Sequence, residues 1–373
     1  MPSNIVGYEW PIEGTKQVVY VTGDDHIHEM VGQASRWRDT DVTRTANAPT
    51  IPLEMTIMAG YTWPEGRTKQ IAYVSPVEGS KHIHELVMRE GNTWSYADLM
   101  DQLTDAPSAD GNAIVGYVWK TNGTKQVVFI SGDGHVHELV VGTVGMWKHT
   151  DLTQQTNAPL VEGDALAAYA WEAGRTKQVV FISGDGHVHE LAAGTDGTWK
   201  HTDMTEVTNA PVADEDSSLV GCAWETGGTK QVVYTGNGGR MYELVAGKDG
   251  TWKYIDVLKQ SNGPLVDGSA LSGYAWETGG TKQVVYVSED RHIQELTAGT
   301  DGKWSHTDLT HLIGAPVAAS DILVGYEWTS QFAKQVVYLD TRENPHIHEL
   351  MLEHGGSWRH TDLTTLTGAS DIV

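Results

Sequence analysis

The residues best suited to chemistry in this chain are an amide, a carboxylate and an indole that recur together seven times. In each copy a Gln opens one β-rich run, a Glu closes the next, and a Trp follows that Glu by eight or nine residues. Sugars need this combination, because hydroxyls require fixed donors and acceptors and the C–H face of a pyranose packs on an aromatic plane. The candidate sugar-binding residues are Gln17, Glu29, Trp37, Gln70, Glu85, Trp94, Gln126, Glu138, Trp147, Gln178, Glu190, Trp199, Gln231, Glu243, Trp252, Gln283, Glu295, Trp304, Gln335, Glu349 and Trp358.

The same residues allow a structural interpretation. A Lys directly precedes each Gln, and a Lys or Gln that meets the Glu across strands beside a packed Trp would tie the strands together. Segments 124–139 and 176–191 are nearly identical, which indicates duplication, and duplication preserves a brace as readily as a binding site. Both interpretations stay open. They differ in whether the Glu is accessible beside the Trp or is buried against Lys or Gln.

Paired histidines are a second candidate, in this case for metal binding. Residues i and i+2 of a strand share one face, so His135 and His137 could act together as ligands. The pairs are His26/His28, His82/His84, His135/His137, His187/His189 and His346/His348. A stable zinc site needs further ligands, the Glu of the same strand points to the opposite face, and two copies lack the pair. We therefore expect no metal site.

A His-Thr-Asp motif near the end of four copies is a third candidate. It occurs at 149–151, 201–203, 306–308 and 360–362. His and Asp are suited to acid–base catalysis, but no nucleophile recurs with them. Asp beside a loop usually caps or turns the backbone. We interpret this Asp as structural and predict no catalytic residues.

All these motifs belong to one unit, which repeats every 52 to 56 residues and contains two of the fourteen tryptophans. In the third copy, runs 114–119, 124–130, 135–141 and 147–153 are β-rich and are separated by short turns containing Gly, Asn or Asp. No segment has the apolar spacing of a long amphipathic helix. Seven copies of four short antiparallel strands predict an all-β fold, a seven-bladed β-propeller.

The propeller is expected to be a single domain over 1–373. Its blades fall at about 5–55, 56–111, 112–163, 164–215, 216–267, 268–320 and 321–373. A Gly or Ala lies in the middle of each first strand, and we expect it to prevent a collision at the central axis. Residues 1–4 and 370–373 would form the seam of the ring, with the C-terminal segment held against blade one.

Composition limits the partners. The net charge of −24 and pI near 5.0 argue against nucleic acid and anionic membrane surfaces, which both need a basic patch. Cys222 is the single cysteine, so no intrachain disulfide is expected. The first residues show no basic segment followed by an apolar one, and no apolar run is long enough for membrane insertion. The expected location is cytoplasmic, or outside the cell after release without a signal peptide.

The copies resemble the blades of the fucose-specific lectins of fungi and bacteria, whose repeat reads L-A-A-x-x-W … [I/V]-R-V-Y … I-x-E … W. Segments 165–171, 178–181 and 187–190, with Trp199, follow this pattern. The resemblance implies sugars bound between blades by an Arg, a Glu and an aromatic platform. These fall on Gln126, Glu138 and Trp147 and their equivalents, with Gln in place of Arg in every copy. The family ring has six blades, whereas this sequence predicts seven.

Together these observations predict a multivalent carbohydrate-binding protein, a lectin with up to seven similar sites between blades. Its partners would be glycans or glycoconjugates, and no cofactor is expected. Two alternatives remain. One is a propeller enzyme with a single axial or inter-blade pocket, for example for a cyclisation in secondary metabolism. The other is a scaffold that binds protein on one rim, and the oligomeric state stays open.

Overall fold

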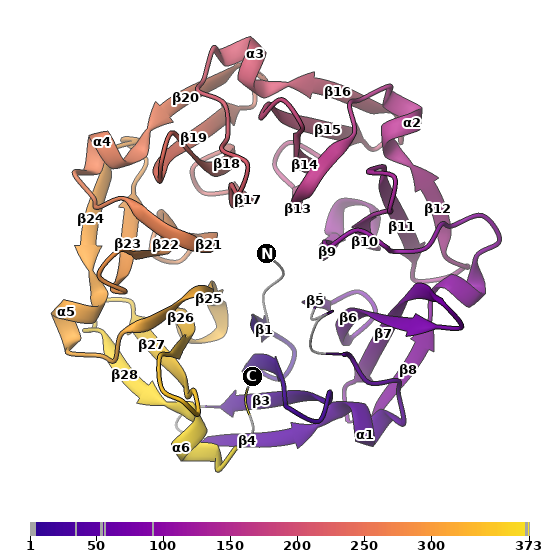
Figure 1. Ribbon diagram of the computed structural model, residues 1–373, viewed down its shortest axis with the longest axis horizontal. Coiled ribbons are helices and arrows are strands. Elements are labelled where there is room, and N and C mark those ends of the chain that lie inside the picture. The colour runs from indigo at the N-terminus through magenta and orange to yellow at the C-terminus, as the bar shows by residue number, and fades with distance from the viewer. Residues whose placement is uncertain are drawn as a thin grey trace.

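Seven four-stranded antiparallel sheets form a closed ring in the computed structural model (Figure 1). The structure describes residues 5–33, 36–52, 55, 57–91, 93–369 and 372. Each sheet consists of four strands that are consecutive in the chain, so each copy of the sequence repeat makes one blade. The predicted all-β, seven-bladed β-propeller is confirmed.

Within each blade the four strands lie side by side in chain order, the first nearest the central axis and the fourth at the outer edge (Figure 1). The first strands are β1 (Ile5–Trp10), β5 (Met58–Trp63), β9 (Ile114–Trp119), β13 (Val161–Trp171), β17 (Leu219–Trp224), β21 (Val266–Trp276) and β25 (Ala318–Trp328). The second strands are β2 (Thr15–Val21), β6 (Thr68–Val77), β10 (Thr124–Ile130), β14 (Thr176–Ser183), β18 (Thr229–Gly236), β22 (Thr281–Ser288) and β26 (Ala333–Asp340). Strands β13, β21 and β25 begin slightly before the expected blade boundaries.

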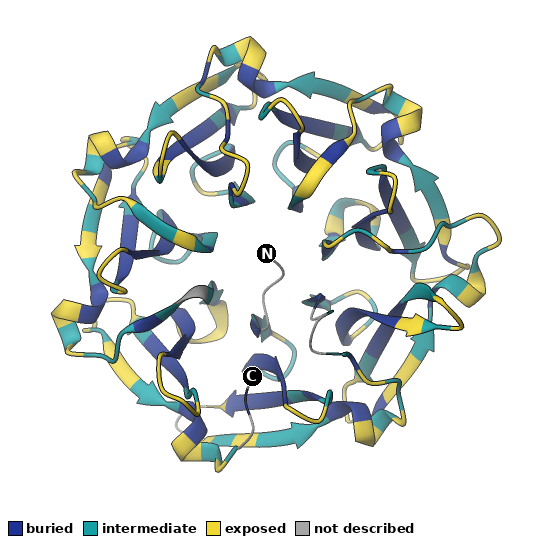
Figure 2. Cartoon of the chain, in the orientation of Figure 1, coloured by how far each residue is buried: buried dark blue, intermediate teal, exposed yellow. Residues whose placement is uncertain are grey.

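The third strand of each blade is largely buried, whereas the fourth is short and more exposed at the edge of the ring (Figure 2). The third strands are β3 (Ile27–Gln33), β7 (Ser80–Arg89), β11 (Val136–Gly142), β15 (Val188–Gly194), β19 (Arg240–Gly247), β23 (Ile293–Ala298) and β27 (Ile347–Glu353). The fourth strands are β4 (Arg36–Asp41), β8 (Trp94–Asp98), β12 (Lys148–Asp151), β16 (Trp199–Asp203), β20 (Trp252–Asp256), β24 (Trp304–Asp308) and β28 (Arg359–Asp362).

A single helical turn follows the fourth strand in six blades. These helices are α1 (Val42–Ala46), α2 (Leu152–Thr156), α3 (Met204–Thr208), α4 (Val257–Ser261), α5 (Leu309–Ile313) and α6 (Leu363–Thr367), and 3-10 turns lie at η2 (Met100–Gln102), η3 (Lys120–Asn122) and η4 (Thr329–Gln331). The last Asp of strand four caps each α-helix, as Asp151 does by accepting a bond from the backbone N–H of Gln154. The structural interpretation of this Asp is confirmed. None of the described helices is long and apolar enough to cross a membrane.

Alternating strand direction places the turns of each blade on two opposite rims of the ring. The turns between strands one and two and between strands three and four lie on one rim, here named the tryptophan rim because both tryptophans of each blade flank these turns. The hairpins between strands two and three, the helices and the connections between blades lie on the other, here named the hairpin rim.

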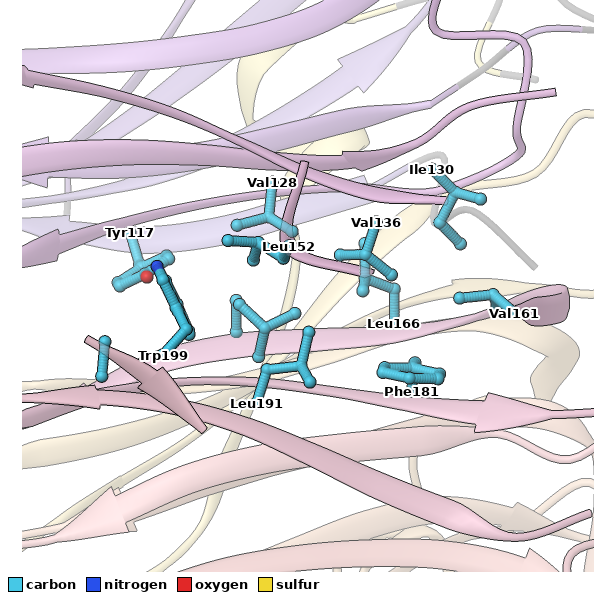
Figure 3. Close-up of a cluster of buried hydrophobic side chains, with 13 residues drawn as sticks. Tyr117, Val128, Ile130, Val136, Leu152, Val161, Leu166, Phe181, Leu191 and Trp199 are labelled. Carbon is cyan, nitrogen blue, oxygen red and sulfur yellow. The ribbon is translucent and has the colours of Figure 1, made fainter. Parts of the chain in front are cut away.

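The hydrophobic core is divided into clusters that join neighbouring blades. In one of them Tyr117, Val128 and Leu152 of blade three pack with Phe181 and Trp199 of blade four (Figure 3). Equivalent clusters bury the inner three strands of the other blades (Figure 2). The blades therefore depend on each other for burial, as expected of a repeat fold.

The glycine in the first strand makes room for a neighbouring blade rather than for the axis. A Cβ added at Gly116 would lie 2.2 Å from the ring of Tyr61 in the preceding blade, and Gly7, Gly60, Gly221 and Gly325 show the same conflict at 2.4 or 2.5 Å. This corrects the expectation that the collision would occur at the axis. The Gly recurs because the ring of a Tyr in the preceding blade fills the space that a Cβ would occupy.

The ring closes between blade seven and blade one. Residues 1–4, 370, 371 and 373 of the predicted seam lie outside the described residues. Ile372 forms an antiparallel bridge with Thr22 and packs with Ile5 and Val18 of blade one. The C-terminal segment is thus held against blade one at the position that the structure describes.

Candidate functional site

The two faces of every blade carry different parts of the recurring motif. In blade one Gln17 lies opposite Val31 and Glu29 opposite Val19, which places Gln and Glu on one face. Lys16 lies opposite Gly32, and Gly32 lies opposite Trp37, which places Lys and the second Trp on the other face. Neighbouring blades therefore bring a Glu face and a Lys face together.

Each interface between blades contains a buried ion pair between that Lys and the Glu of the preceding blade. The Nζ–Oε distances are 2.5–2.7 Å in six pairs, and Lys282 contacts Glu243 in the seventh. The pairs are Lys16–Glu349, Lys69–Glu29, Lys125–Glu85, Lys177–Glu138, Lys230–Glu190, Lys282–Glu243 and Lys334–Glu295. No Glu in this set is more than 4% exposed, and no Lys more than 7%.

Two indoles enclose each lysine. The Nζ of Lys177 lies 4.8 Å from the ring centroid of Trp199 in its own blade and 5.8 Å from that of Trp119 in the preceding blade. All seven lysines lie between a first and a second Trp, at 4.7–5.9 Å from the centroids. Attraction between a cation and an aromatic face is strongest where water is excluded, as here.

Further donors complete the coordination of the carboxylates. Tyr61 donates to Glu85 at 2.7 Å, and Trp304 donates its indole N–H to Glu243 at 2.9 Å. Burial raises the pKa of Glu138, although Lys177 and Tyr117 oppose the rise. Burial likewise lowers the pKa of Lys69 against the attraction of Glu29. Desolvation thus penalises both charges, and their mutual contact is what compensates for it.

The glutamines lie behind this layer and do not reach the Glu. Gln126 donates its amide to Thr124 of the same strand at 2.6 Å, and five other glutamines make the equivalent bond. The glutamine carbonyl oxygens have no hydrogen-bond partner among the described residues at Gln17, Gln70, Gln126, Gln178, Gln283 and Gln335. The indole N–H of every first Trp is in the same situation. Buried water is the ordinary partner of such atoms.

This geometry bears on the two interpretations of the motif. Glu, Lys and both tryptophans form an inter-blade brace in which the ion pair is buried, and a sugar could reach the Glu carboxylate only after the lysine had left it. Of the candidate residues, Trp37, Trp252 and Trp358 are half-buried, whereas the other four second tryptophans are buried. The contact of these residues with a sugar stays a prediction.

Open grooves lie on the tryptophan rim, immediately outside the brace. In blade one a groove of about 440 Å³ is lined by Glu13, Thr15, Val31, Gln33, Arg36, Trp37 and Arg38. In blade four a groove of about 510 Å³ occupies the equivalent place, with Arg175, Thr176, Thr198 and Lys200 among its lining residues. Each groove lies on the Glu face of its blade, because Val31 and Ala192 are the register partners of Gln17 and Gln178.

Histidines form a separate network near the hairpin rim. His135 contacts Asp151 at 2.8 Å, and the equivalent contact recurs in blades one, two, four, six and seven. In blade three Ser131, His137 and His149 make a chain of contacts of 2.9 and 3.0 Å. Burial lowers the pKa of His137 to about 4, which Asp151 opposes and His149 reinforces.

Two of these histidines have two carboxylates nearby. They are His82 with Asp98 and Asp101, and His292 with Asp290 and Asp308, where the nearest ligand atoms lie within 4.8 Å of one another. In each group one carboxylate, Asp101 or Asp290, belongs to a neighbouring turn. The spacing of histidines within the strand could not reveal it.

Comparison with solved structures finds the same fold in several propeller lectins. The BP39L lectin from Burkholderia pseudomallei covers 96% of the chain, and the chain covers 98% of it, with a TM-score of 0.73 and 12% sequence identity. The Aleuria aurantia lectin, described as a six-bladed β-propeller with a novel fucose recognition mode, covers 82% of the chain and is itself covered to 96%, with a TM-score of 0.54 and 14% identity.

A third neighbour is the SapL1 lectin in complex with α-methyl fucoside, which covers 82% of the chain and is itself covered to 94%, with a TM-score of 0.50 and 14% identity. No protein-family model and no curated protein matches the sequence. The resemblance to the fucose-specific lectins, which was seen in the repeats, is confirmed at the level of fold. Identities this low support a shared architecture and nothing finer.

Sequence analysis named Lys or Gln as a possible partner of Glu within one blade, but it did not predict that the Lys would come from the following blade. The available signal was the period of two along a strand, which puts adjacent Lys and Gln on opposite faces. In a ring of identical units, the Lys face of one blade must meet the Glu face of another. Arg36 and Arg38 were missed as well, because neither position carries the same residue in all seven copies.

Proposed function

We propose that the chain is a multivalent carbohydrate-binding protein whose ligands bind in the grooves that individual blades form on the tryptophan rim. The observation that carries this proposal is the groove of blade one, where Gln33, Arg36 and Arg38 surround an opening of about 440 Å³ beside Trp37. The equivalent groove of blade four offers Arg175, Thr198 and Lys200. The fold that the chain shares with solved lectins supports the same function.

The chemistry of the groove suits a saccharide. Guanidinium and amide groups donate to ring hydroxyls, Glu13 accepts from them, and the edge of the half-buried Trp37 offers an apolar surface to C–H groups. The twenty-one Gln, Glu and Trp residues predicted from the repeats enter the proposal in two roles. The exposed edges of the half-buried Trp37, Trp252 and Trp358 contact the sugar, and the buried Glu, Gln and remaining second tryptophans fix the wall against which it binds.

Repetition gives this proposal its expected binding behaviour. Grooves arranged around one rim can engage several sugars of one surface at once, and linked sites gain about 10²–10⁴ in avidity over a single site. Binding to a dense glycan surface should therefore be much tighter than binding to a free monosaccharide. The enzyme and scaffold alternatives gain no comparable observation from the described part of the chain.

A glycan array probed with the full chain tests the proposal. We expect binding to at least one class of glycan, and isothermal titration with the free oligosaccharide should give a weaker affinity than the array. Gln33→Ala with Arg36→Ala should weaken binding, and the matched control Lys259→Ala, on α4 of the hairpin rim, should leave it unchanged. If neither array nor titration detects any glycan, the proposal is wrong.

A further inference from the structure

We infer that the grooves of the tryptophan rim select anionic saccharides, those that carry carboxylate or sulfate groups. The inference rests on the proposed function, because it names the class of glycan that these grooves would take. It comes from the placement of basic residues in a chain whose net charge is −24.

A basic residue occupies one register position on strand four in five blades. Arg38 lies opposite Val31, and Lys200 lies opposite Ala192, which are the residues that line the two grooves. The five basic residues are Arg38, Lys148, Lys200, Lys253 and Arg359. Ser95 and Ser305 take this position in blades two and six, so the feature is not a fixed part of the repeat.

These cations are exposed and mostly unpaired. Among the described residues Arg38, Lys148, Lys200 and Lys253 make no ion pair, and Arg359 contacts only Glu353. On the hairpin rim, by contrast, Arg44, Arg240 and Arg342 each contact an Asp. In so acidic a protein, cations left without a carboxylate are available to a ligand that brings one.

The groove cations also lie close to the brace of the next interface. Burial raises the pKa of Glu29, and Arg38 joins Lys69 in opposing that rise. Arg359 adds to the burial that lowers the pKa of Lys16 in blade one. Strand four thus places its cation on the face that its blade turns toward the following one, and the groove is formed by residues of its own blade.

Acidic side chains of the tryptophan rim are largely engaged by the backbone. Glu225 accepts from the N–H groups of Glu172 and Ala173 in the preceding blade, and Glu9 does the same for Thr329 and Ser330. Glu172, Glu277 and Glu327 make equivalent contacts. These carboxylates cap turns and do not pair with the groove cations.

The hairpin rim carries the opposite charge. Around the blade-four hairpin, a pocket of about 300 Å³ is lined by Glu162, Asp185, Asp214 and Glu215 with no basic residue. Each groove of the tryptophan rim has two basic residues and one acidic residue, Glu13 or Asp196, among its lining. The hollows on the two rims therefore differ in the sign of their net charge, and an anionic polymer would approach the tryptophan rim. Arg36 and Arg38 offer planar, charge-assisted donors that match carboxylate and sulfate oxygens.

Exposed Lys and Arg on an edge strand also discourage pairing with another sheet, and this explanation requires no ligand. The place of the cations whose removal weakens binding distinguishes a binding groove from protection of the edge strand. An effect of general charge would be the same for cations removed from either rim, whereas a binding groove loses affinity only when its own cations are removed.

The test uses the full chain and three octasaccharides: a heparin fragment, which carries sulfate and carboxylate, a hyaluronan fragment, which carries carboxylate alone, and neutral maltooctaose. One variant replaces the five groove cations, Arg38, Lys148, Lys200, Lys253 and Arg359, with Gln. The control replaces five hairpin-rim cations, Arg44, Lys81, Arg240, Lys259 and Arg291, with Gln and has the same net charge. Circular dichroism and thermal unfolding confirm that both are folded.

Titration should show binding of the heparin or the hyaluronan fragment that weakens as salt rises. The groove variant should lose about tenfold or more in affinity, because several charge-assisted contacts disappear, and the control less than about twofold. Binding of hyaluronan would identify carboxylate as sufficient, and binding of heparin alone would identify sulfate. Equal losses in both variants would overturn the inference. Binding of neutral glycans on the array with no preference for the anionic fragments would overturn it and leave the proposed function standing.

Discussion

The buried brace between blades and the open grooves beside it use neighbouring positions of the same strands, yet they differ in how they vary around the ring. Lys, Glu and both tryptophans of the brace are identical in all seven blades, and the Lys and Glu of every pair are buried. The groove positions vary, from Arg36 and Arg38 in blade one to Thr198 and Lys200 in blade four. The invariant layer holds the ring together, and the variable layer is where blades can differ in ligand.

The brace should respond to substitution with the largest change in stability. Lys177→Met leaves Glu138 charged and unpaired in a dry interface, and we expect the free energy of unfolding to fall by about 3–5 kcal/mol. Denaturant unfolding measures this change. Lys200→Met, at the exposed groove position of the same blade, should change stability by less than about 0.5 kcal/mol.

The double variant Lys177→Met with Glu138→Gln sharpens the result. Removing both charges should restore part of the lost stability, because no buried charge remains to be compensated. If Lys177→Met unfolds no more easily than Lys200→Met, the lysine does not hold the interface.

Acid should destabilise the histidine network near the hairpin rim while leaving the grooves intact. The pKa of His137 and of His189 is lowered to about 4 in the folded chain, mainly by burial, and lies near 6.5 in an unfolded one. The unfolded state therefore binds protons first, and stability should fall as the pH drops from about 6.5 towards 4. Each histidine should cost about 2 kcal/mol between pH 7 and pH 5.

Blade six supplies the control for this prediction. There Gln294 replaces the second histidine and still contacts Ser288 at 2.8 Å and His306 at 2.6 Å. The double variant His137→Gln with His189→Gln should flatten the pH dependence of denaturant unfolding. The loss of pH dependence should equal the sum of the contributions of the two histidines. An unchanged slope would place the acid-sensitive groups elsewhere.

Loss of groove cations should change binding and leave stability alone. Arg36→Gln with Arg38→Gln should weaken binding of the glycan found on the array about tenfold, because two charge-assisted donors are lost. The melting temperature should stay within about 2 °C of the parent, as expected for exposed residues away from the core. A similar drop in stability and in binding would mean that these arginines support the fold instead.

The smallest effect concerns the one interface that lacks a tyrosine. Cys222 takes the place of Tyr117 and its equivalents, so Glu243 lacks the phenol that Glu138 receives at 3.2 Å. Gly273 is retained in the next blade, where the atom nearest to an added Cβ belongs to Val220. Cys222→Tyr should raise the free energy of unfolding by about 1 kcal/mol, the value of a typical hydrogen bond. A less stable variant would show that blade five leaves no space for the Tyr ring.

The repeat alone was enough to predict the fold. A period of 52 to 56 residues, Gly- and Asp-containing turns and alternating β-formers allow few architectures. The role of the first-strand Gly was predicted wrongly, because its neighbour Tyr belongs to a different blade and spacing within one repeat says nothing about contacts between repeats. Figure 3 shows how such contacts mix side chains of adjacent blades.

The candidate site was less predictable for the same reason. Recurrence identified Glu and Trp as important, but it could not distinguish a carboxylate that awaits a ligand from one that a neighbouring Lys already occupies. The choice depends on which faces of adjacent blades meet. Groove residues such as Arg36 have no counterpart in most copies, so a search for repeated motifs passes over them.

The most direct test of the account is a crystal structure of the chain with the tightest-binding oligosaccharide from the array. We predict that the sugar lies in the groove of blade one in contact with Arg36 and Arg38, while Lys69 remains paired with Glu29. A sugar seated between Glu29 and Trp94, with Lys69 displaced from both, would contradict the account and return the binding site to the brace.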